Sequence, residues 1–594
     1  MTPNKKPQSR RPYSRPAAPR RDGFARQASE ATTLPTAANK LRIIPLGGLE
    51  EVGKNMTAFE YGNDIVIVDM GLMFPNEDMP GVDYVVPDVT YLQKKAKNIR
   101  GLLITHGHLD HIGAIPYLIE KIGMPPVFAT KLTAGLMNQR LAEFGLEKRT
   151  RVTEFHPDDK LNLGVFSVSF FRVTHSIPDC VGIAIKTPLG TIVHTGDFKV
   201  DHTPVDQQPM EFHKISQLGH EGVLLLLSES TNAWKDGYSI SEKTIGKNIL
   251  NIVEQAPGRV VIATFASLIS RIQQIVNAAV LTGRKLSVSG RSVEQNLELA
   301  VRLGYIKMPK DTYVSINKVD NYPDNKVIIL ATGSQGQDNS SLSRMSRGEH
   351  KHVKIRKGDL VVISSSPIPG NERAVQTLMD ALFRAGAMVN YNRDLDIHTS
   401  GHGYRKDLEL MLALVKPKYF IPIHGQRYML EEHKLLAKAM GVFPENIFVM
   451  QNGAVLEIDK HGATISKTSV PAGYVMVDGL GVGDIGNVVL RDRKVMAEDG
   501  MVVVLVKIDD KTNKLVGEPD IITRGFIYVK SSDRLLFETK QKIRHTIIAA
   551  ASKTMTDKIE DWNNVRGLLR DDLSDFFFKE TERRPMILPV IIKV

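Results

Sequence analysis

The sequence predicts a chain of several α/β domains, and three observations lead to this fold class. First, several apolar runs of strand length follow position 41, and a further one occupies 419–423. Several of these runs are followed directly by a histidine or a carboxylate. Second, residues 231–385 alternate strand and helix patterns, which is typical of a parallel sheet. Third, short strand patterns at 455–458, 476–478, 487–490, 501–508 and 527–528 and a helix pattern from 540 to about 553 follow position 452. A length of 594 residues exceeds one ordinary core, so we expect two to four domains.

Composition limits the class of protein. Hydrophobic residues make up 42% of the chain and charged residues 24%, as in soluble globular proteins. No apolar run approaches the roughly 18 residues that a membrane span needs, so no span is expected. The single cysteine, Cys180, excludes an intrachain disulfide and a cysteine-based metal cluster. This cysteine usage predicts a cytoplasmic location.

Basic charge is concentrated at the N-terminus. The net charge is +11, and residues 1–39 contain eight Lys or Arg, two acids and six prolines. This segment has too few apolar residues to offset the entropy of ordering, so we expect a disordered basic arm over 1–39. Two interpretations are open: the arm tethers RNA through its phosphates, or it is a solvated tail.

The histidine-rich segment 105–111, THGHLDH, is the central motif of the first unit. It follows the apolar run 101–104 and precedes the amphipathic run 112–121, which predicts a loop between a buried strand and a helix. Imidazole and carboxylate are ligands that suit zinc or manganese, and alternate residues of a tight turn can converge on one ion. The motif therefore predicts a metal site formed by His106, His108, Asp110 and His111.

Further residues that can bind metals stand at the ends of other predicted strands. Asp69 follows the strand 65–68, where it could orient a metal ligand or form a turn. Four others end later strands in the same way: His175, Asp197, Glu229 and His424. In a layered α/β fold this pattern brings such residues together on one rim of the sheets.

The region 231–385 separates His424 from the earlier candidates. Its predicted helices, 241–252 and 269–281, alternate with the predicted strands 260–263, 285–289, 327–330 and 360–364. This alternation predicts a parallel sheet within an inserted domain. We expect the insert to face the rim on which the metal-binding residues gather.

Two segments rich in small polar residues lie within or beside this insert. One contains Ser364, Ser365 and Ser366; the other is His398-Thr399-Ser400-Gly401-His402. Hydroxyl groups and glycine let backbone N–H groups approach an anion closely, which favours a phosphate clamp. For the serines, a Ser-rich turn is the alternative.

These segments resemble the β-CASP nucleases, a nucleic-acid branch of the metallo-β-lactamase superfamily, and within that branch the bacterial ribonuclease J family. The likeness runs from about Leu41 to the end of the chain and includes segments 47–55, 105–111, 228–232, 264–271, 331–335, 367–372, 398–402 and 583–594. It implies an α/β fold: a metallo-β-lactamase αββα sandwich with an inserted β-CASP α/β domain and a small C-terminal α/β domain. The sequence departs from the family pattern at 337–341, QDNSS, which concerns RNA contacts rather than chemistry.

The resemblance also implies domain boundaries. Beyond the arm, the metallo-β-lactamase domain would occupy 40–235 and, after the β-CASP insert at 236–385, continue over 386–450. A linker at 451–468 would lead to a C-terminal oligomerisation domain at 469–594.

Carried onto this sequence, the family's site implies two metal ions. His106, His108 and His175 would bind one ion, Asp110, His111 and His424 the other, and Asp197 would bridge them. Zinc is expected, with manganese as the other option. Asp83, with Asp478, is a candidate site for a structural cation.

The implied activity is a metal-dependent ribonuclease that acts on single-stranded RNA as a 5′ to 3′ exonuclease and an endonuclease, leaves 5′ phosphates and serves RNA maturation and decay. Asp110 would orient the attacking hydroxide, and Glu229 with His398 or His402 would protonate the leaving group. The loop 398–402 would bind substrate phosphate. The implied assembly is a homodimer or homotetramer, and the implied partner is an RNA helicase or the ribosome. The alternative function is that of a β-CASP DNA-processing nuclease.

Overall fold

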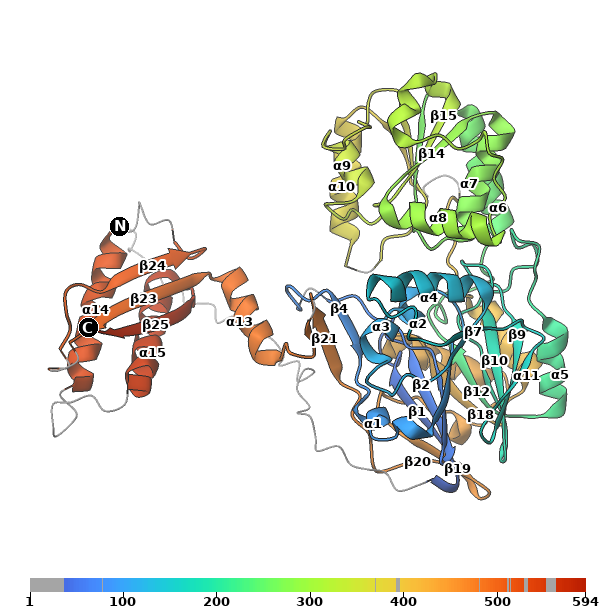
Figure 1. Cartoon of the computed structure of the whole chain (residues 1–594), viewed down its shortest axis with the longest axis horizontal. Coiled ribbons are helices and arrows are strands. Elements are labelled where there is room, and N and C mark those ends of the chain that lie inside the picture. Colours follow the sequence, from blue (N-terminus) through green and yellow to red (C-terminus); the bar gives the residue numbers. More distant parts are fainter. Residues whose placement is uncertain are drawn as a thin grey trace, which may run out of the picture.

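The computed structural model describes residues 37–76, 78–368, 370–391, 396–479, 481–509, 512, 514–527, 533–551 and 562–594 (Figure 1). The predicted basic arm lies outside the described residues up to position 36. Residues 37–39 begin strand β1 (Ala37–Gly47), so this strand starts before position 41, where the apolar pattern of the sequence begins.

Two sheets form the body of the molecule. The first has eight strands in the order β20-β19-β1-β2-β3-β5-β6-β7, namely Gly462–Ile465, Leu456–Asp459, Ala37–Gly47, Met56–Gly62, Asp64–Val68, Ile99–Leu103, Val127–Ala129 and Val152–Glu154. The second has six in the order β18-β12-β11-β10-β9-β8, namely Tyr419–Ile423, Val223–Glu229, Gly190–His194, Val181–Thr187, Phe166–Arg172 and Lys160–Leu163.

Helices cover the outer face of each sheet, which gives four layers. Strand β3 shows how the sequence produces this arrangement, because its side chains alternate between faces. Ile65 and Ile67 pack with α1 (Thr90–Gln93), α3 (Ile115–Leu118) and α4 (Lys131–Glu143), whereas Val66 and Val68 pack against the second sheet. The second sheet is covered by α5 (Phe212–Glu221), α11 (Arg405–Val415) and α12 (Arg427–Ala439). A strand buried on both faces is apolar throughout.

The segment after the histidine motif differs from its prediction. The sequence predicts one helix over 112–121, but the structure has two short helices, α2 (Leu109–Ile112) and α3. Pro116 occupies the second position of α3, where a missing N–H is tolerated at a helix start but not in a helix interior. Asp110 and His111 therefore lie on the first turn of a helix rather than in a loop.

The insert is a separate sheet with helices on both faces, as the strand and helix pattern predicts. Its order is β14-β15-β13-β16-β17, namely Lys285–Ser289, Val327–Ala331, Val260–Ala263, Leu360–Ile363 and Met388–Asn390, and every pair is parallel. One face packs on α6 (Glu242–Gln255), α7 (Ile269–Thr282) and α8 (Arg291–Leu303); the other packs on α9 (Ser341–Ser346) and α10 (Glu372–Arg384). In Figure 1 the insert stands above the sandwich, with α8 over α4.

The C-terminal part joins the sandwich through β21 (Tyr474–Asp478), which pairs with β4 (Tyr84–Pro87) and β22 (Gly481–Val482). Helix α13 (Asn487–Glu498) then leads to a sheet of β24 (Asp520–Arg524), β23 (Met501–Ile508) and β25 (Met586–Lys593). Helices α14 (Asp533–Ala551) and α15 (Trp562–Thr581) cover one face of this sheet, which lies apart from the sandwich (Figure 1).

Two predicted strands of this region are wrong or displaced. Residues 487–490 were predicted as a strand from the apolar run Val488-Val489-Leu490, but they begin α13, because the following residues up to Glu498 favour a helix. The strand predicted at 527–528 is absent at Ile527, and Tyr528 lies outside the described residues. The antiparallel partner of β23 is β24 instead. Among the described residues, no helix combines the length and apolar composition needed to cross a membrane.

Candidate active site

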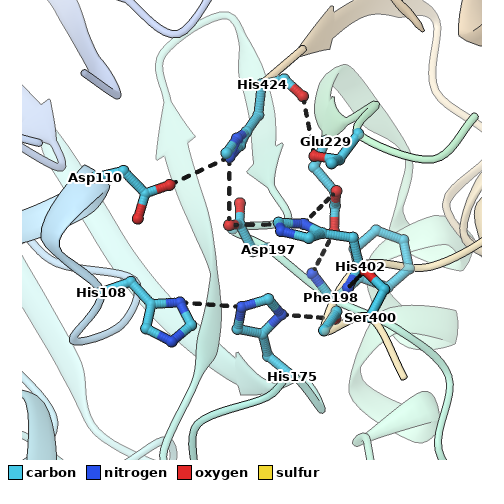
Figure 2. Close-up of polar contacts among 12 residues, drawn as sticks. His108, Asp110, His175, Asp197, Phe198, Glu229, Ser400, His402 and His424 are labelled. Carbon is cyan, nitrogen blue, oxygen red and sulfur yellow. Dashed lines mark hydrogen bonds and ion pairs between the residues drawn. The ribbon is translucent and has the colours of Figure 1, made fainter. Parts of the chain in front are cut away.

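The seven predicted metal ligands meet at one rim of the sandwich, beyond the ends of β5, β9, β11 and β18. Figure 2 shows His108, Asp110, His175, Asp197 and His424 among them. His106 and His108 follow β5, and Asp110 and His111 lie on α2. His175, Asp197 and His424 come from the second sheet. Strands that run side by side place their following loops at a common edge, so residues far apart in sequence become neighbours.

Three imidazoles form the first group. The Nδ1 atom of His108 lies 3.1 Å from Nε2 of His106 and 3.2 Å from Nε2 of His175. The possible ligand atoms of these three residues all lie within 4.8 Å of one another. Nitrogen atoms so close to each other are arranged as ligands around a shared ion would be.

The second group combines Asp110, His111, Asp197 and His424 within the same 4.8 Å limit. His111 Nε2 lies 3.1 Å from Asp197 Oδ2, and His424 Nε2 lies 3.5 Å from Asp110 Oδ2 and 3.6 Å from Asp197 Oδ2. Asp197 Oδ2 also lies 3.8 Å from His106 Nε2 in the first group. Asp197 therefore stands between the two groups.

The chemistry of these side chains fits divalent metal ions. Nε2 of His108 and both ring nitrogens of His424 are buried and have no hydrogen-bond partner among the described residues. Burial lowers the pKa of His108 to about 4 and also lowers the pKa values of His106 and His175, which keeps these rings neutral. Neutral imidazole is the form that binds metals.

Asp69 contacts a ring nitrogen of one predicted metal ligand, His111. Its Oδ2 lies 2.7 Å from Nδ1 of His111, while its Oδ1 accepts from the backbone N–H of Thr105 at 2.8 Å. Burial lowers the pKa of His111, but Asp197, Asp110 and Asp69 outweigh this and raise it well above its usual value. Of the two interpretations of Asp69, the contact with His111 favours the orienting one.

Two residues of the site were not singled out from the sequence. Asn55 Nδ2 donates to the carbonyl of Asp110 at 3.1 Å and lies 3.2 Å from Nε2 of His111. Gly71 packs so closely that a Cβ there would lie 1.5 Å from the carbonyl oxygen of Asp110. In the sequence, Gly71 is distinguished only by its position two residues after Asp69, and Asn55 only by its position at the end of the family segment 47–55.

His402 and Glu229 form an acid-base pair beside the metal ligands. His402 Nδ1 lies 2.9 Å from Glu229 Oε2 and 3.8 Å from Asp197 Oδ2 (Figure 2). Glu229 Oε1 accepts from the backbone N–H of Phe198 at 2.8 Å, which fixes the carboxylate. Burial lowers the pKa of His402, but the charge of Glu229 and the hydrogen bond to it raise the pKa to about 9.

His398 lies in a different environment from His402. Burial and the charge of Arg271 lower the pKa of His398 to about 3, opposed by Glu242. Arg271 is buried, pairs with Glu242 at 3.0 Å and donates to the carbonyl of Ile397 at 2.9 Å. The loop 398–402 therefore has one histidine at the metal ligands and one at the buried ion pair.

The predicted phosphate-binding hydroxyls make contacts within the chain. Ser364 Oγ accepts from Arg271 and donates to the carbonyl of Ile397, and Gln335 Nε2 donates to Ser365 Oγ and to the carbonyl of Ser366. Thr399 Oγ1 donates to the carbonyl of Ile240 at 3.0 Å, and Ser400 Oγ accepts from Asn232 at 3.0 Å. The carbonyl of Gly401 lies 2.7 Å from His175 Nδ1, so the loop also supports a predicted metal ligand. Phosphate binding by these residues stays a prediction.

Asp83 and Asp478 lie on neighbouring strand ends but have other partners. Asp83 Oδ2 accepts from the backbone N–H of Gly479 at 2.8 Å, and Asp478 Oδ2 forms an ion pair with Arg493 at 2.6 Å. A structural cation between these carboxylates stays a prediction.

Four family models match successive parts of the chain. The beta-lactamase superfamily domain matches residues 79–217, and the beta-CASP domain of ribonuclease J matches 257–382. The Zn-dependent metallo-hydrolase RNA specificity domain matches 393–450, and the ribonuclease J C-terminal domain matches 488–594.

Full-length relatives agree with these matches. Ribonuclease J2 of Bacillus subtilis is 42% identical over 554 residues, which cover 93% of this chain and 99% of that protein. Ribonuclease J 1 of Streptococcus pyogenes is 42% identical over 561 residues, which cover 94% and 99%. The chain belongs to the ribonuclease J family. A crystal structure of a protein of unknown function from Enterococcus faecalis shares the fold, with a TM-score of 0.52 at 15% identity over 70% of this chain and 99% of that one.

Membership of the ribonuclease J family identifies the chain as a metal-dependent ribonuclease, a hydrolytic nuclease that binds RNA. It also confirms the predicted metallo-β-lactamase fold with its β-CASP insert and C-terminal domain. The DNA-processing alternative is not favoured. The histidine and aspartate cluster is compatible with a metal site, while the number and identity of the ions stay predictions.

Proposed function

We propose that this ribonuclease uses two divalent ions to cleave single-stranded RNA from the 5′ end and internally, leaving 5′ phosphates, in RNA maturation and decay. The observation that carries the proposal is the presence of two ligand groups that meet at Asp197, beside the His402–Glu229 pair. Such a pair of sites suits an in-line displacement at phosphorus, because both the attacking and the leaving oxygen need stabilisation.

In this proposal His106, His108 and His175 hold one ion, and Asp110, His111 and His424 hold the other, with Asp197 shared. Zinc is the preferred ion and manganese the second option, because imidazole and carboxylate suit both. When bound, such ions neutralise charge on a phosphodiester and acidify water.

The chain's own residues supply the proton transfers. Asp110 is the most exposed member of its ligand group, so it can orient the attacking water and accept its proton. Attack at phosphorus breaks the bond to the 3′ oxygen, which leaves as a hydroxyl after taking one proton. We assign that proton to His402 rather than His398, because Glu229 holds the ring of His402 beside Asp197 and favours its protonated form.

The domain division expected from the sequence is part of the proposal. Each of the four family matches falls within one of the units 40–235, 236–385, 386–450 and 469–594, which supports the division. Strand β17 (Met388–Asn390), however, joins the sheet of the insert, so the insert's sheet includes residues beyond 385.

We further propose that the protein forms a homodimer or homotetramer joined through the last unit, 469–594. We propose that it acts in the cytoplasm, with an RNA helicase or the ribosome as a partner.

Single substitutions of metal ligands test the proposed site. We expect His108→Ala and Asp110→Ala to abolish cleavage of 5′-monophosphorylated RNA, while RNA binding measured by fluorescence anisotropy persists. His156→Ala is the matched control, since His156 is an exposed histidine away from the site. Metal content of each purified variant is measured on the same sample. Full turnover by His108→Ala in buffer containing zinc or manganese would refute the assignment.

The position of bond cleavage is tested with isotope-labelled water. Hydrolysis in ¹⁸O water should place the label on the 5′ phosphate of the downstream product, as mass spectrometry of short oligonucleotides can show. Label on a 3′ phosphate would refute the proposed displacement.

Time courses with 5′-monophosphorylated, 5′-triphosphorylated and circular RNA separate exonuclease from endonuclease action. A DNA oligonucleotide of the same sequence tests the alternative substrate.

A further inference from the structure

An exposed tryptophan lies close to the proposed active site without a role in the chemistry. The chain has two tryptophans, and Trp234, five residues after Glu229, is 48% exposed. Tyr238, four residues further on, is 61% exposed. A half-exposed indole leaves apolar surface in contact with water, and a ligand that covered the ring would remove this surface from water.

The segment that carries Trp234 is attached to the loop 398–402 and to the start of α11. Asn232 Nδ2 donates to Ser400 Oγ at 3.0 Å and to the carbonyl of His402 at 3.2 Å. On the other side of Trp234, the carbonyl of Lys235 accepts from the backbone N–H of Arg405 at 2.9 Å. Trp234 thus lies between two anchored residues, one of which contacts the backbone of the proposed general acid, His402. Ser400 and His402 are visible in Figure 2.

Lys235 places a positive charge beside the indole. Its Nζ lies 5.2 Å from the ring centroid of Trp234 and 5.2 Å from that of Tyr404, so the ammonium group contacts two aromatic rings. A cation over an aromatic face is attracted by the ring and restrains its orientation. Aromatic faces combined with positive charge are the features with which proteins bind single-stranded nucleic acid.

We propose that Trp234 stacks on a base of the single-stranded RNA that enters the active site, and that Lys235 supports this ring and attracts the RNA backbone. This inference rests on the proposed substrate, single-stranded RNA. Stacking accepts every base, because each has an aromatic face, so the contact positions the strand without selecting a sequence. The strand is thereby held next to His402, where the leaving oxygen is protonated.

Fluorescence of Trp234 tests the contact directly. Trp562→Phe leaves Trp234 as the only tryptophan, and adding Asp110→Ala prevents cleavage during the measurement. We expect saturable quenching by 5′-monophosphorylated oligouridylate. An abasic nucleotide at one position of the oligonucleotide should remove the quenching while anisotropy still reports binding. Absence of quenching at saturating RNA, or quenching that no abasic position removes, would overturn the proposal.

Kinetics of otherwise unaltered protein give a second test. Trp234→Ala should raise KM for RNA by about 5-fold to 100-fold, the effect of losing one stacked base, with a smaller change in kcat. Trp234→Phe should recover most of the affinity, because a phenyl ring can still stack. Phe443→Ala is the matched control. Phe443 is an exposed aromatic residue that follows the C-terminal end of α12, whereas His424 precedes the N-terminal end of that helix.

The outcomes separate this inference from the proposed function. Unchanged KM in Trp234→Ala, with active wild type, overturns the stacking contact and leaves the ribonuclease site intact. A lower molecular mass of Trp234→Ala in light scattering would assign the indole to a contact between subunits and also overturn it. Wild type that binds and quenches with RNA but does not cleave it would refute the proposed chemistry instead.

Discussion

At the scale of single residues, the metal ligands depend on a second set of polar groups that fixes their orientation. His111 is held by Asp69, and His175 is held by the carbonyl of Gly401. An imidazole whose second nitrogen is hydrogen-bonded has a defined tautomer and ring position, so less order must be imposed when an ion binds. These contacts should therefore influence metal affinity although the groups that make them bind no metal.

Replacing Asp69 tests this dependence. Asp69→Ala should weaken metal binding by about 10-fold to 100-fold, because His111 loses the acceptor at 2.7 Å that orients its ring. Metal content after dialysis against graded chelator is the measurement, and ribonuclease activity should recover at high metal concentration. Asp64→Ala is the control, since Asp64 begins the same strand β3 and pairs with Arg100. Equal metal retention by both variants would contradict the role of Asp69.

At the scale of elements, strand ends and the turns after them position the site. Asp69 after β3 and His424 after β18 both have left-handed backbones, with φ of 61° and 53°. This conformation costs non-glycine residues about 1–2 kcal/mol, so the surrounding contacts must stabilise it. Helix α12, which follows His424, packs on β18 through His433, whose ring lies 4.8 Å from that of Phe420.

His433 should make this packing sensitive to acid. Burial lowers its pKa to about 3 from an ordinary 6.5, so the folded chain binds a proton there less readily than the unfolded chain. The stability that neutral His433 contributes is full above pH 6.5 and declines as the pH falls toward 3. Its share of the decline approaches about 1.4 kcal/mol per pH unit.

The measurement is denaturant unfolding of wild type and His433→Gln at pH 7, 6 and 5. The substituted protein should lose less stability than wild type between pH 6 and 5, even if it is less stable at pH 7. Titration of other histidines affects both proteins and cancels in the difference. Parallel loss of stability in the two proteins would contradict the assignment to His433.

At the scale of the whole molecule, the C-terminal sheet presents an open apolar face. Leu588, Val590 and Ile592 alternate along β25 and are 40%, 39% and 41% exposed. They lie in register beside Val503, Leu505 and Lys507 of β23, while the opposite face packs on α14 and α15. A contiguous apolar face on a sheet is typical of a contact between subunits, which agrees with the proposed oligomer.

A charge on this face should separate the subunits. Val590→Glu would place a carboxylate within the proposed contact, where desolvation without a partner is costly. We expect multi-angle light scattering to give the mass of a monomer, 66.0 kDa, with cleavage of short RNA retained. Lys357→Glu, a charge change at an exposed residue of the insert and away from this sheet, should leave the mass unchanged. An unaltered mass of Val590→Glu would place the subunit contact elsewhere.

Features that depend on local sequence patterns could be predicted without the structure. Strands β13 and β18 have the predicted bounds, because short apolar runs flanked by breaking residues have few alternatives. The metal-binding candidates were found for the same reason: each belongs to a recognisable motif or follows a strand, and neighbouring strands share a rim. Where the local pattern was ambiguous, as at Val488-Val489 and Pro116, longer context decided the element.

Which residues of the rim act on one another could be seen only in the folded molecule. His398 and His402 are equivalent in the sequence, yet His402 contacts Glu229 across 173 positions, while His398 lies by the Arg271–Glu242 ion pair. Ser364 likewise bonds to Arg271 within the chain. The direction of a side chain in a loop follows from packing against segments distant in sequence, and no local periodicity encodes it.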